Sequence, residues 1–314
     1  MKISEFIAPR TSKIVEKPIP ETGDNDVLIK VVLCGVCGSE LHNWQEGTSG
    51  YPQYFGHEAV GYVTKTGRNV SEFKAGDRVT GLFEYAFAEY AKADQLNVVK
   101  IPDTVKDDEA LGEPISCIVS GVRRVNVDLA KTIAIIGVGF MGLMTLQLMK
   151  LRGAGKIIAI DNREDMLETA KKFGADEIYK PSEVPDHYKL YDMNGITGSD
   201  IVIECTGNEK ALNMAIELLK NHGLLSVVGF HQGKYRKVNF EMLNWKAGDL
   251  INAHERRKDE QIKCMKIGMK LLENKQLDIK SMITNRYSLD EVDQAFSDFE
   301  NKKHGYVKSI IVMK

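Results

Sequence analysis

The sequence is poor in the features that mark secreted, membrane-spanning and nucleic-acid-binding proteins. It has only five cysteines in 314 residues, an odd and scattered set that argues against a disulfide framework and indicates reduced thiols. No apolar run approaches the roughly 20 residues that span a bilayer, and the first residues, MKISEFIAPR, lack the apolar core of a signal peptide. The formal net charge is -2 and Lys and Arg form no long run, which argues against a nucleic-acid surface. We therefore expect a cytoplasmic protein with no membrane or nucleic-acid partner.

The chain is long enough for two domains, and its pattern changes partway along. Through the first hundred or so residues, short alternating or apolar runs such as DVLIKVVLCG and GDRVTGLF are separated by Gly, Asp and Asn. From Leu111 onward strands alternate with helices, which predicts a parallel sheet covered on both faces. We expect a β-rich domain over residues 1–118, a doubly wound α/β domain over 119–253, and a C-terminal return over 254–314.

Helix signals in the second half of the chain are strong enough to predict particular ends. The segment NEKALNMAIELLKNHG predicts a helix that ends at Gly223, because glycine is favoured just after a helix. The segment DEQIKCMKIGMKLLEN predicts a long helix in the C-terminal return. Ser288 and Glu291 in YSLDEVDQAF predict a capping box before a further helix.

A glycine-rich loop, TIAIIGVGFMG, follows a predicted strand and opens a predicted helix. Gly137, Gly139 and Gly142 form G-x-G-x-x-G, and Phe140 and Met141 complete the loop. In such a loop the first glycine makes the tight turn, the second lets the backbone approach a pyrophosphate, and the third allows close helix–strand packing. The helix N-terminus offers free N–H groups and a positive dipole to the phosphates. The loop therefore predicts a dinucleotide site.

An acid follows the glycine loop at the distance that a dinucleotide site needs. Asp161 ends the strand KIIAID, about 20 residues on, where an acid accepts hydrogen bonds from the ribose hydroxyls and repels a 2′-phosphate. This favours NAD over NADP. Asn162 and Arg163 belong to the same turn, and Arg163 is able to tolerate a phosphate. The alternative is a packing glycine loop with a chance aspartate, which the joint presence of strand, helix and acid disfavours.

Three segments of the first domain are rich in metal-ligating side chains: CGVCGSELH, YFGHEAVG and LGEPIS. Cys37, His57 and Glu113 would give one thiolate, one imidazole and one carboxylate, a set that suits a catalytic zinc with one open position. The spacing is long and irregular. Single residues of these types are more often a buried thiol, a satisfied core histidine and a solvated acid.

Taken together and in order, these motifs resemble the medium-chain, zinc-dependent alcohol dehydrogenases, and among them the sorbitol (polyol) dehydrogenase branch. GVCGSELHNW resembles that branch's G-[IV]-C-G-S-[DE]-x-H-x-W, and GHEAVGYV resembles its G-H-E-x-x-G-x-V. GDRV, EPISCIVSGVRR, GVGFMG and ECTG also match, so the resemblance covers nearly the whole chain. It implies a GroES-like catalytic domain, a Rossmann cofactor domain, and a homo-oligomer, either dimer or tetramer.

For the metal, the resemblance implies Cys37 and His57 as zinc ligands and Glu113 as a carboxylate near the ion. Glu58 would be a fourth ligand or an outer-sphere group. Zn²⁺ with the Cys37 thiolate and one carboxylate is already neutral, so a second carboxylate would weaken its ability to stabilise an alkoxide. We therefore expect Glu58 and Glu113 not to bind tightly at once. Cys34, the other cysteine of the C-x-x-C pair, is expected to be a packed thiol.

The resemblance also implies the reaction, a reversible oxidation of a secondary alcohol to a ketone with NAD, in which zinc is the Lewis acid. Ser39 would take the hydroxyl proton and His42 would relay it outward. The alternatives are that Ser39 caps the following helix turn and that His42 is a surface histidine. The expected small-molecule substrate is a polyol, cyclitol, sugar or amino-sugar derivative.

Further contacts are expected on loops that follow predicted strands, where ligands bind in open α/β folds. The additional cofactor-binding candidates are Cys205, Thr206, Gly207, Gly229 and Phe230. For Cys205, packing beneath the loop is the alternative. The candidate substrate contacts are Trp44, Tyr85 and His254, although an aromatic residue is more often core than contact.

One departure from the family concerns the metal content. Many relatives carry, after GDRV, a lobe with four closely spaced cysteines that binds a structural zinc. This chain has no cysteine between Cys37 and Cys117, so we expect one catalytic zinc and no structural zinc. Two other functions compete: a metal-free quinone or enone reductase of the same superfamily, and a non-catalytic NAD-binding protein. Intact Cys, His and Glu positions argue against both.

Overall fold

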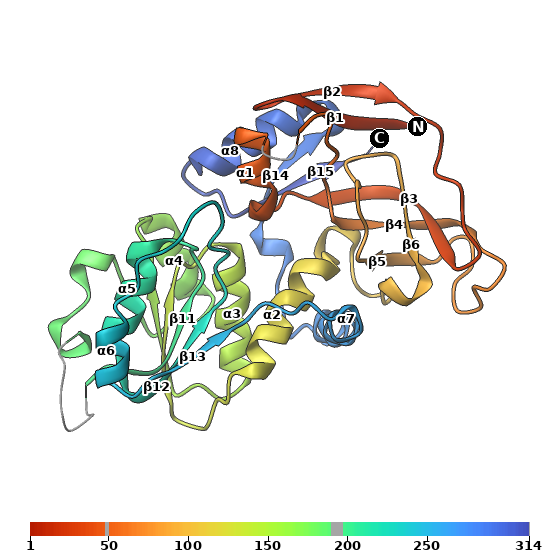
Figure 1. Cartoon of the computed structure of the whole chain (residues 1–314). Helices are drawn as coiled ribbons and strands as arrows, with labels where there is room; N and C mark the ends of the chain where they lie inside the picture. The colour runs from red at the N-terminus through yellow and green to blue at the C-terminus, as the bar shows by residue number, and fades with distance from the viewer. Residues whose placement is uncertain (48–49, 190–196, 314) are drawn as a thin grey trace. The chain divides into compact units, whose positions relative to one another are not determined.

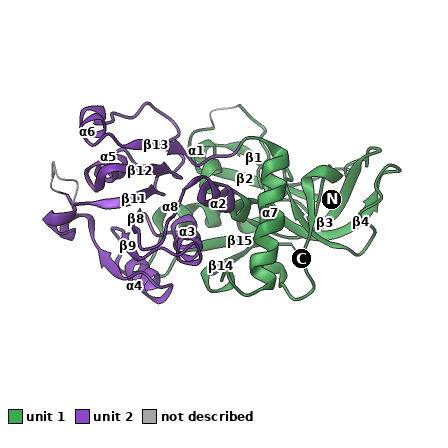
Figure 2. Ribbon diagram, turned by 90° about the horizontal axis from the view of Figure 1, so that it is seen from below, with its two compact units in different colours: residues 1–116, 256–314 green, residues 117–255 purple. Residues whose placement is uncertain are grey.

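The computed structural model describes the chain in three stretches: residues 1–47, 50–189 and 197–313. The described chain divides into two compact units (Figure 2). Unit 1 joins Met1–Ser116 to Arg256–Lys314, and unit 2 is Cys117–Glu255. Each unit has its own sheet and its own hydrophobic core.

Unit 1 is built mainly of β-strands, as the short apolar runs predicted. Among the described residues its strands are β1 (Lys2–Ala8), β2 (Thr11–Glu16), β3 (Asp26–Gly35), β4 (Glu58–Thr66), β5 (Arg78–Gly81), β6 (Tyr90–Asp94), β7 (Val98–Lys100), β14 (Ile283–Ser288) and β15 (Lys308–Val312). β1 and β2 form a hairpin, and the others form one sheet in the order β14-β15-β3-β4-β5-β7, with β6 also paired to β3. The long central strand β3 is mostly buried, with Lys30 exposed, which accounts for its largely apolar sequence.

The C-terminal segment completes the sheet of unit 1. β15 pairs antiparallel with β3, with Ile311 opposite Cys34 and Ile310 opposite Gly35. The helices of this part of the chain are α1 (Gly38–Glu46), α7 (Lys258–Glu273) and α8 (Val292–Asn301), while α2 (Gly112–Arg124) runs from unit 1 into unit 2. The capping box of Ser288 and Glu291 is present, at the short 3₁₀ turn that leads into α8.

Unit 2 is a doubly wound parallel sheet. Its strands are β8 (Thr132–Ile136), β9 (Lys156–Ile160), β10 (Glu177–Tyr179), β11 (Ser199–Glu204), β12 (Leu219–Val227) and β13 (Asp249–Asn252), and its further helices are α3 (Phe140–Leu151), α4 (Glu164–Lys172), α5 (Glu209–Glu217) and α6 (Phe240–Trp245). The strands lie in the order β10-β9-β8-β11-β12-β13, all parallel. α5 and α6 lie on one side of the sheet and α3 on the other (Figure 1). The order reverses between β8 and β11, where ligands of open α/β sheets bind.

The prediction that a helix ends at Gly223 is wrong. α5 ends at Glu217 and β12 begins at Leu219, so Gly223 lies inside a strand. Leu219 is buried and pairs with Ser199 of β11, so sheet pairing overrides the local helical pattern. Across the described residues, no helix is both long and apolar enough to span a bilayer.

Candidate metal centre and cofactor loop

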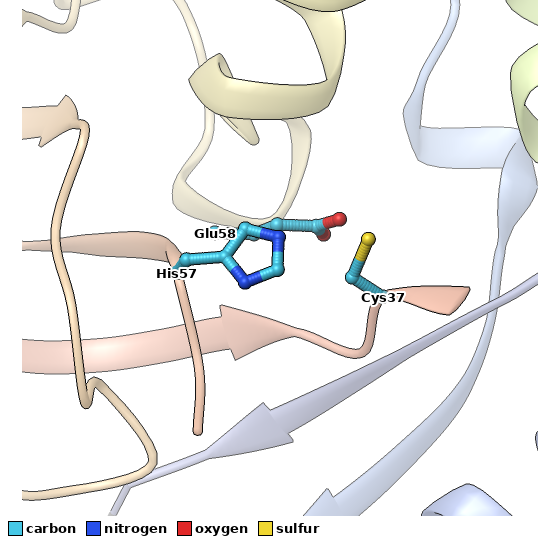
Figure 3. Close-up of side chains that lie close together, drawn as sticks. All are labelled: Cys37, His57 and Glu58. Atoms are coloured by element: carbon cyan, nitrogen blue, oxygen red, sulfur yellow. The ribbon is translucent and has the colours of Figure 1, made fainter. Parts of the chain in front are cut away.

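Three metal-ligating side chains come together at the junction of β3 and β4. One donor atom each of Cys37, His57 and Glu58 lies within 4.8 Å of the others. Figure 3 shows the Cys37 sulfur beside the Glu58 carboxylate, with a nitrogen of the His57 ring turned toward them. The antiparallel pairing of Gly35 with Glu58 accounts for this convergence, because Cys37 follows the end of β3 and His57 precedes the start of β4.

Glu58 is buried beneath the end of β3 in contact with a lysine. A Cβ at Gly35 would lie 1.8 Å from Glu58 Oε2, so the carboxylate has room here only because residue 35 is a glycine. Lys308 Nζ donates to Glu58 Oε1 at 2.9 Å and lies 2.6 Å from Oε2. Burial disfavours the lysine's charge, but the Glu58 carboxylate and the Cys37 thiolate raise the pKa of Lys308 above its ordinary value. The pair is therefore ionic.

His57 is oriented by a second buried acid. Glu40 Oε1 lies 2.8 Å from His57 Nδ1 and also accepts the N–H of Gly56 at 2.7 Å. Because a carboxylate only accepts, Nδ1 carries the proton and Nε2 is the nitrogen left for a metal. Burial opposes the ring's charge, yet Glu40 and then Cys37 raise the pKa of His57 well above its ordinary value.

The other predicted residues of the centre lie nearby without joining the three ligands. Ser39 Oγ donates to Cys37 Sγ at 3.2 Å. The N-cap of α1 is Cys37, so the alternative that Ser39 caps the helix is wrong. His42 lies one turn further along α1, and within the described residues no hydrogen bond joins it to Ser39. Glu113 is in the first turn of α2, close enough for its charge to act on Lys308.

The donor set fits a zinc ion. Thiolate, imidazole and carboxylate are all zinc ligands, and three protein ligands leave the fourth position for substrate or water. Glu58 Oε2 is buried and lies 2.6 Å from Lys308 Nζ, and a carboxylate oxygen has a second lone pair with which it can bind a metal ion. Cys34 is wholly buried, and burial raises the pKa of its thiol, as expected of a packed thiol without a metal role.

The two aromatic substrate candidates of unit 1 have different surroundings. Trp44 is 3% exposed, its indole N–H donates to Asp293 at 2.9 Å, and its ring stacks on Phe296. It belongs to the hydrophobic core and is not free to contact a substrate, which corrects the prediction. Tyr85 is 54% exposed and has a φ of 58°, a strained conformation for a non-glycine residue. The amide of Ala86, the next residue, donates to the carbonyl of Gly56, so Tyr85 lies near His57 along the chain's path.

The glycine loop has the geometry of a pyrophosphate cradle. Gly137 has a φ of 85°, and a Cβ at Gly142 would lie 2.0 Å from the carbonyl oxygen of Gly137. Gly139 is the N-cap of α3, and a Cβ there would meet nothing within 4 Å. Phe140 and Met141 form the first turn of the helix. The open space in front of Gly139 and the N-terminus of α3 behind it fit a phosphate.

Asp161 stands at the end of β9 and is tied to the glycine loop. Its Oδ2 accepts the N–H of Val138 and its Oδ1 accepts the N–H of Arg163, both at 2.9 Å. Asn162 lies between them in the same turn. The Nε of Arg163 is 3.8 Å from Asp165 Oδ1, so this guanidinium has an acidic neighbour of its own.

The loops after β11 and β12 pack against each other and against the glycine loop. A Cβ at Gly229 would lie 2.2 Å from the amide of Gly207, and one at Gly137 would lie 2.4 Å from Thr206 Cγ2. Phe230 is 47% exposed, and the ring of His254 lies 5.6 Å from its ring. Burial raises the pKa of the Cys205 thiol, which supports packing beneath the loop. The structure thus brings the predicted loops together at the carboxyl edge of the sheet.

Three buried charged residues around these sites were not predicted. Glu204, at the end of β11, accepts the amides of Thr206 and Gly207 and lies 2.9 Å from His231 Nε2, so it holds both loops. Glu204, Glu40 and Lys308 are each at most 8% exposed. The signal for Glu204 and Lys308 was a charge within an apolar strand run, as in DIVIECTG and VKSIIVM.

Comparison with known proteins gives the same family over both halves of the chain. The model of the alcohol dehydrogenase GroES-like domain matches residues 23–103, and that of the zinc-binding dehydrogenase matches residues 141–267. The chain is 30% identical to the sorbitol dehydrogenase of Rattus norvegicus over 347 aligned positions, covering 97% of this chain and 93% of the relative.

Solved structures share the fold over the whole length. An oxidoreductase/dehydrogenase of unknown specificity from Escherichia coli matches with a TM-score of 0.89 and 26% identity, covering 100% of this chain and 99% of the other. A protein from Sinorhizobium meliloti 1021, assigned as a zinc-binding dehydrogenase and bound to NADP, matches with a TM-score of 0.87 and 25% identity, covering 99% and 98%.

Proposed function

The chain belongs to the medium-chain zinc-binding alcohol dehydrogenases, in the branch of the sorbitol dehydrogenases, and we propose that it interconverts a secondary alcohol and its ketone with NAD at a single zinc. Its class is that of an alcohol or polyol oxidoreductase. The observation that carries the proposal is the convergence of Cys37, His57 and Glu58 donor atoms within 4.8 Å. This convergence argues against the metal-free reductase and the non-catalytic NAD-binding protein.

The residues of the centre have separate tasks in this proposal. When bound, zinc supplies a Lewis acid for the substrate hydroxyl, and NAD accepts the hydride. Cys37, His57 and Glu58 would hold the ion, and Glu40 keeps His57 Nε2 turned toward it. Ser39, whose hydroxyl lies beside the Cys37 sulfur, would accept the substrate proton at Oγ and release its own hydroxyl proton toward His42, which would pass it to solvent.

The proposed substrate is a polyol, cyclitol, sugar or amino-sugar derivative. Its support is the similarity to sorbitol dehydrogenases, together with the exposed ring of Tyr85 in unit 1. In unit 2, His254 beside Phe230 is the candidate that faces the cofactor loops. We infer no structural zinc, because the chain passes from β5 to β6 without a cysteine.

NAD is proposed as the cofactor in preference to NADP. Asp161 places a carboxylate at the end of β9, where it would repel a 2′-phosphate, and Arg163 already has Asp165 beside it. The similar Sinorhizobium meliloti structure is bound to NADP, so a direct comparison is needed. The test is to measure kcat/KM with each cofactor. We expect a higher kcat/KM with NAD than with NADP, and we expect Asp161→Ser to reduce the ratio of the two values.

A homo-oligomer, dimer or tetramer, is proposed for the assembly, in the cytoplasm. β13 is an edge strand of the parallel sheet, and Phe240, Trp245 and Leu250 near it are between 43% and 66% exposed. An edge strand with apolar neighbours can pair with its copy across a two-fold axis. All five cysteines are free thiols, which suits a reducing compartment. Light scattering of Trp245→Lys should show dissociation relative to the parent protein.

The decisive experiment is an NADH-formation screen with zinc-replete protein across polyols, cyclitols, amino-sugar derivatives and simple secondary alcohols. Turnover is expected with at least one of these classes. Cys37→Ser should abolish it while leaving NAD binding unchanged, because the glycine loop is intact. The matched control is Cys34→Ala, which removes the other thiol of the pair and should keep activity. Full activity in Cys37→Ser would overturn the zinc mechanism.

A further inference from the structure

A lysine from the end of the chain lies buried beside the proposed zinc ligands. Lys308 begins β15, and the N–H of Val36, one residue before Cys37, donates to the carbonyl of Ser309 at 3.0 Å. The pairing of β15 with β3 thus brings a residue 250 positions away in the chain against Glu58. Nothing in the proposed reaction uses this lysine.

The ammonium of Lys308 is enclosed by acceptors. It donates to the carbonyl oxygen of Val36 and to Glu58 Oε1, both at 2.9 Å, and it lies 2.6 Å from Glu58 Oε2. The two side chains are 5% and 1% exposed, so solvent screens their charges only weakly. A buried ion pair of this kind is weak support for a role in stability alone, because desolvation offsets much of the attraction.

The charge of the centre changes when this lysine is counted. A divalent ion held by the Cys37 thiolate and the Glu58 carboxylate, with neutral His57, has no net charge left to attract an anionic fourth ligand. With Lys308 the same group of residues keeps one positive charge. The lysine also competes with the ion for the lone pairs of Glu58, since both contacts use the same carboxylate.

We propose that Lys308 is a positioning residue that sets the charge of the zinc centre: it weakens Glu58 as a metal ligand and keeps the centre attractive to an anion. The inference rests on the proposed zinc site. It revises the sequence-based expectation that Glu58 and Glu113 exclude each other, because Lys308 neutralises one of the two carboxylates. Glu113, in the first turn of α2, adds a further negative charge that acts on Lys308.

Two opposite changes distinguish this role from a structural one. In Lys308→Met, Glu58 loses its cationic partner, so zinc should bind at least about tenfold more tightly. The same variant should bind an anion at the metal at least about tenfold more weakly. If Lys308 only stabilised the position of β15, the same variant would bind zinc more weakly, because loss of the lysine would disorder Glu58.

The measurement is zinc affinity by competition with a chromophoric chelator, followed by azide titration of the Co²⁺-substituted protein by visible absorption. Lys308→Arg should keep both affinities within about threefold of the parent, since it keeps the charge. Lys303→Met removes a lysine whose side chain is 80% exposed and should change neither.

The background variant Glu58→Gln guards against a folding failure. If Lys308→Met does not fold, the double variant Lys308→Met with Glu58→Gln is compared with Glu58→Gln alone, in which Lys308 keeps its charge without its carboxylate partner. Zinc should again bind more tightly in the double variant, because no buried cation then repels the ion. Weaker or unchanged zinc binding in Lys308→Met, or in the double variant relative to Glu58→Gln, would overturn the inference. A parent protein that binds no zinc would instead overturn the proposed function.

Discussion

Single buried charges position the side chains of the metal centre. Glu40 holds His57 by Nδ1, and Lys308 holds Glu58 by both carboxylate oxygens. Partners of metal ligands of this kind fix the ring orientation and the ligand's basicity. The centre therefore depends on residues that do not themselves face the ion.

The first prediction concerns Glu40. Glu40→Gln should lower zinc affinity about 10- to 100-fold, because the amide orients His57 less firmly and removes the negative charge behind the ring. Chelator competition measures the change. Glu46→Gln, an exposed acid on the same helix α1, is the matched control and should bind zinc like the parent. Equal zinc affinity in the two variants would contradict the role of Glu40.

The second prediction concerns a buried lysine outside the site. Lys246 Nζ donates to the carbonyls of Glu217 and Leu219, and burial lowers the pKa of Lys246 to about 8 from an ordinary 10.5. Below pH 8 the lysine is charged in both states, and the folded state carries the cost of burying it. As the pH rises from 8 toward 10.5, the folded lysine is neutral while the unfolded one is still charged, so the free energy of unfolding should rise.

Urea unfolding of the parent and of Lys246→Met at several pH values measures this effect. The difference between their free energies of unfolding should shift in favour of the parent between pH 8 and 10. A difference that stays flat over that range would show that the lysine titrates normally.

For single residues, the sequence identified the metal ligands better than the residues that hydrogen-bond to those ligands. Cys37, His57 and Glu58 stand in motifs whose residue order is informative, and the fold brings them together. Glu40 was not predicted, because nothing in the local sequence marks its burial. Trp44 was assigned to a substrate pocket, yet its indole N–H finds Asp293, 249 positions away in the sequence.

Among the elements, the glycine loop contains one glycine that the fold requires and another that a ligand would require. At Gly142 there is no room for a Cβ, since the carbonyl of Gly137 would be 2.0 Å away, whereas at Gly139 the space is open. The two glycines therefore serve different ends within one turn of backbone.

The third prediction follows from that contrast. Gly139→Ala should stay within about 1 kcal/mol of the parent's unfolding free energy, since alanine is a poorer N-cap than glycine. It should bind NAD at least about tenfold more weakly, because its methyl group occupies the space in front of α3. Gly142→Ala should lose about 1–3 kcal/mol of unfolding free energy through overpacking. Thermal unfolding and NAD titration by calorimetry measure both effects. Normal NAD affinity in Gly139→Ala would contradict the cradle.

Element boundaries were predictable where local signals agree with tertiary contacts. Ser288 and Glu291 form the predicted capping box because both partners lie within one turn. The prediction of a helix end at Gly223 was wrong because the leucines before this glycine suit a helix as well as a buried strand. Only the pairing of β12 with β11, which is not local, decides between them.

Across the whole molecule, the order of apolar runs predicted the fold class. Alternating strands and helices can bury their apolar faces only as a parallel sheet covered on both sides, and unit 2 has that sheet. The interval between Cys37 and Lys308, in contrast, is bridged by the pairing of β15 with β3, which no periodicity reveals. The contribution of Lys308 to the charge of the metal centre therefore could not be predicted from the sequence.

The central claim is that one zinc ion is held by Cys37, His57 and Glu58. Its most direct test is elemental analysis of zinc per chain in the parent protein, in Cys37→Ser and in Cys34→Ala, each with NAD binding measured in parallel. We predict one zinc ion in the parent and in Cys34→Ala, none in Cys37→Ser, and equal NAD affinity in all three. Retention of zinc by a folded Cys37→Ser, or absence of zinc from the zinc-replete parent, would contradict the account.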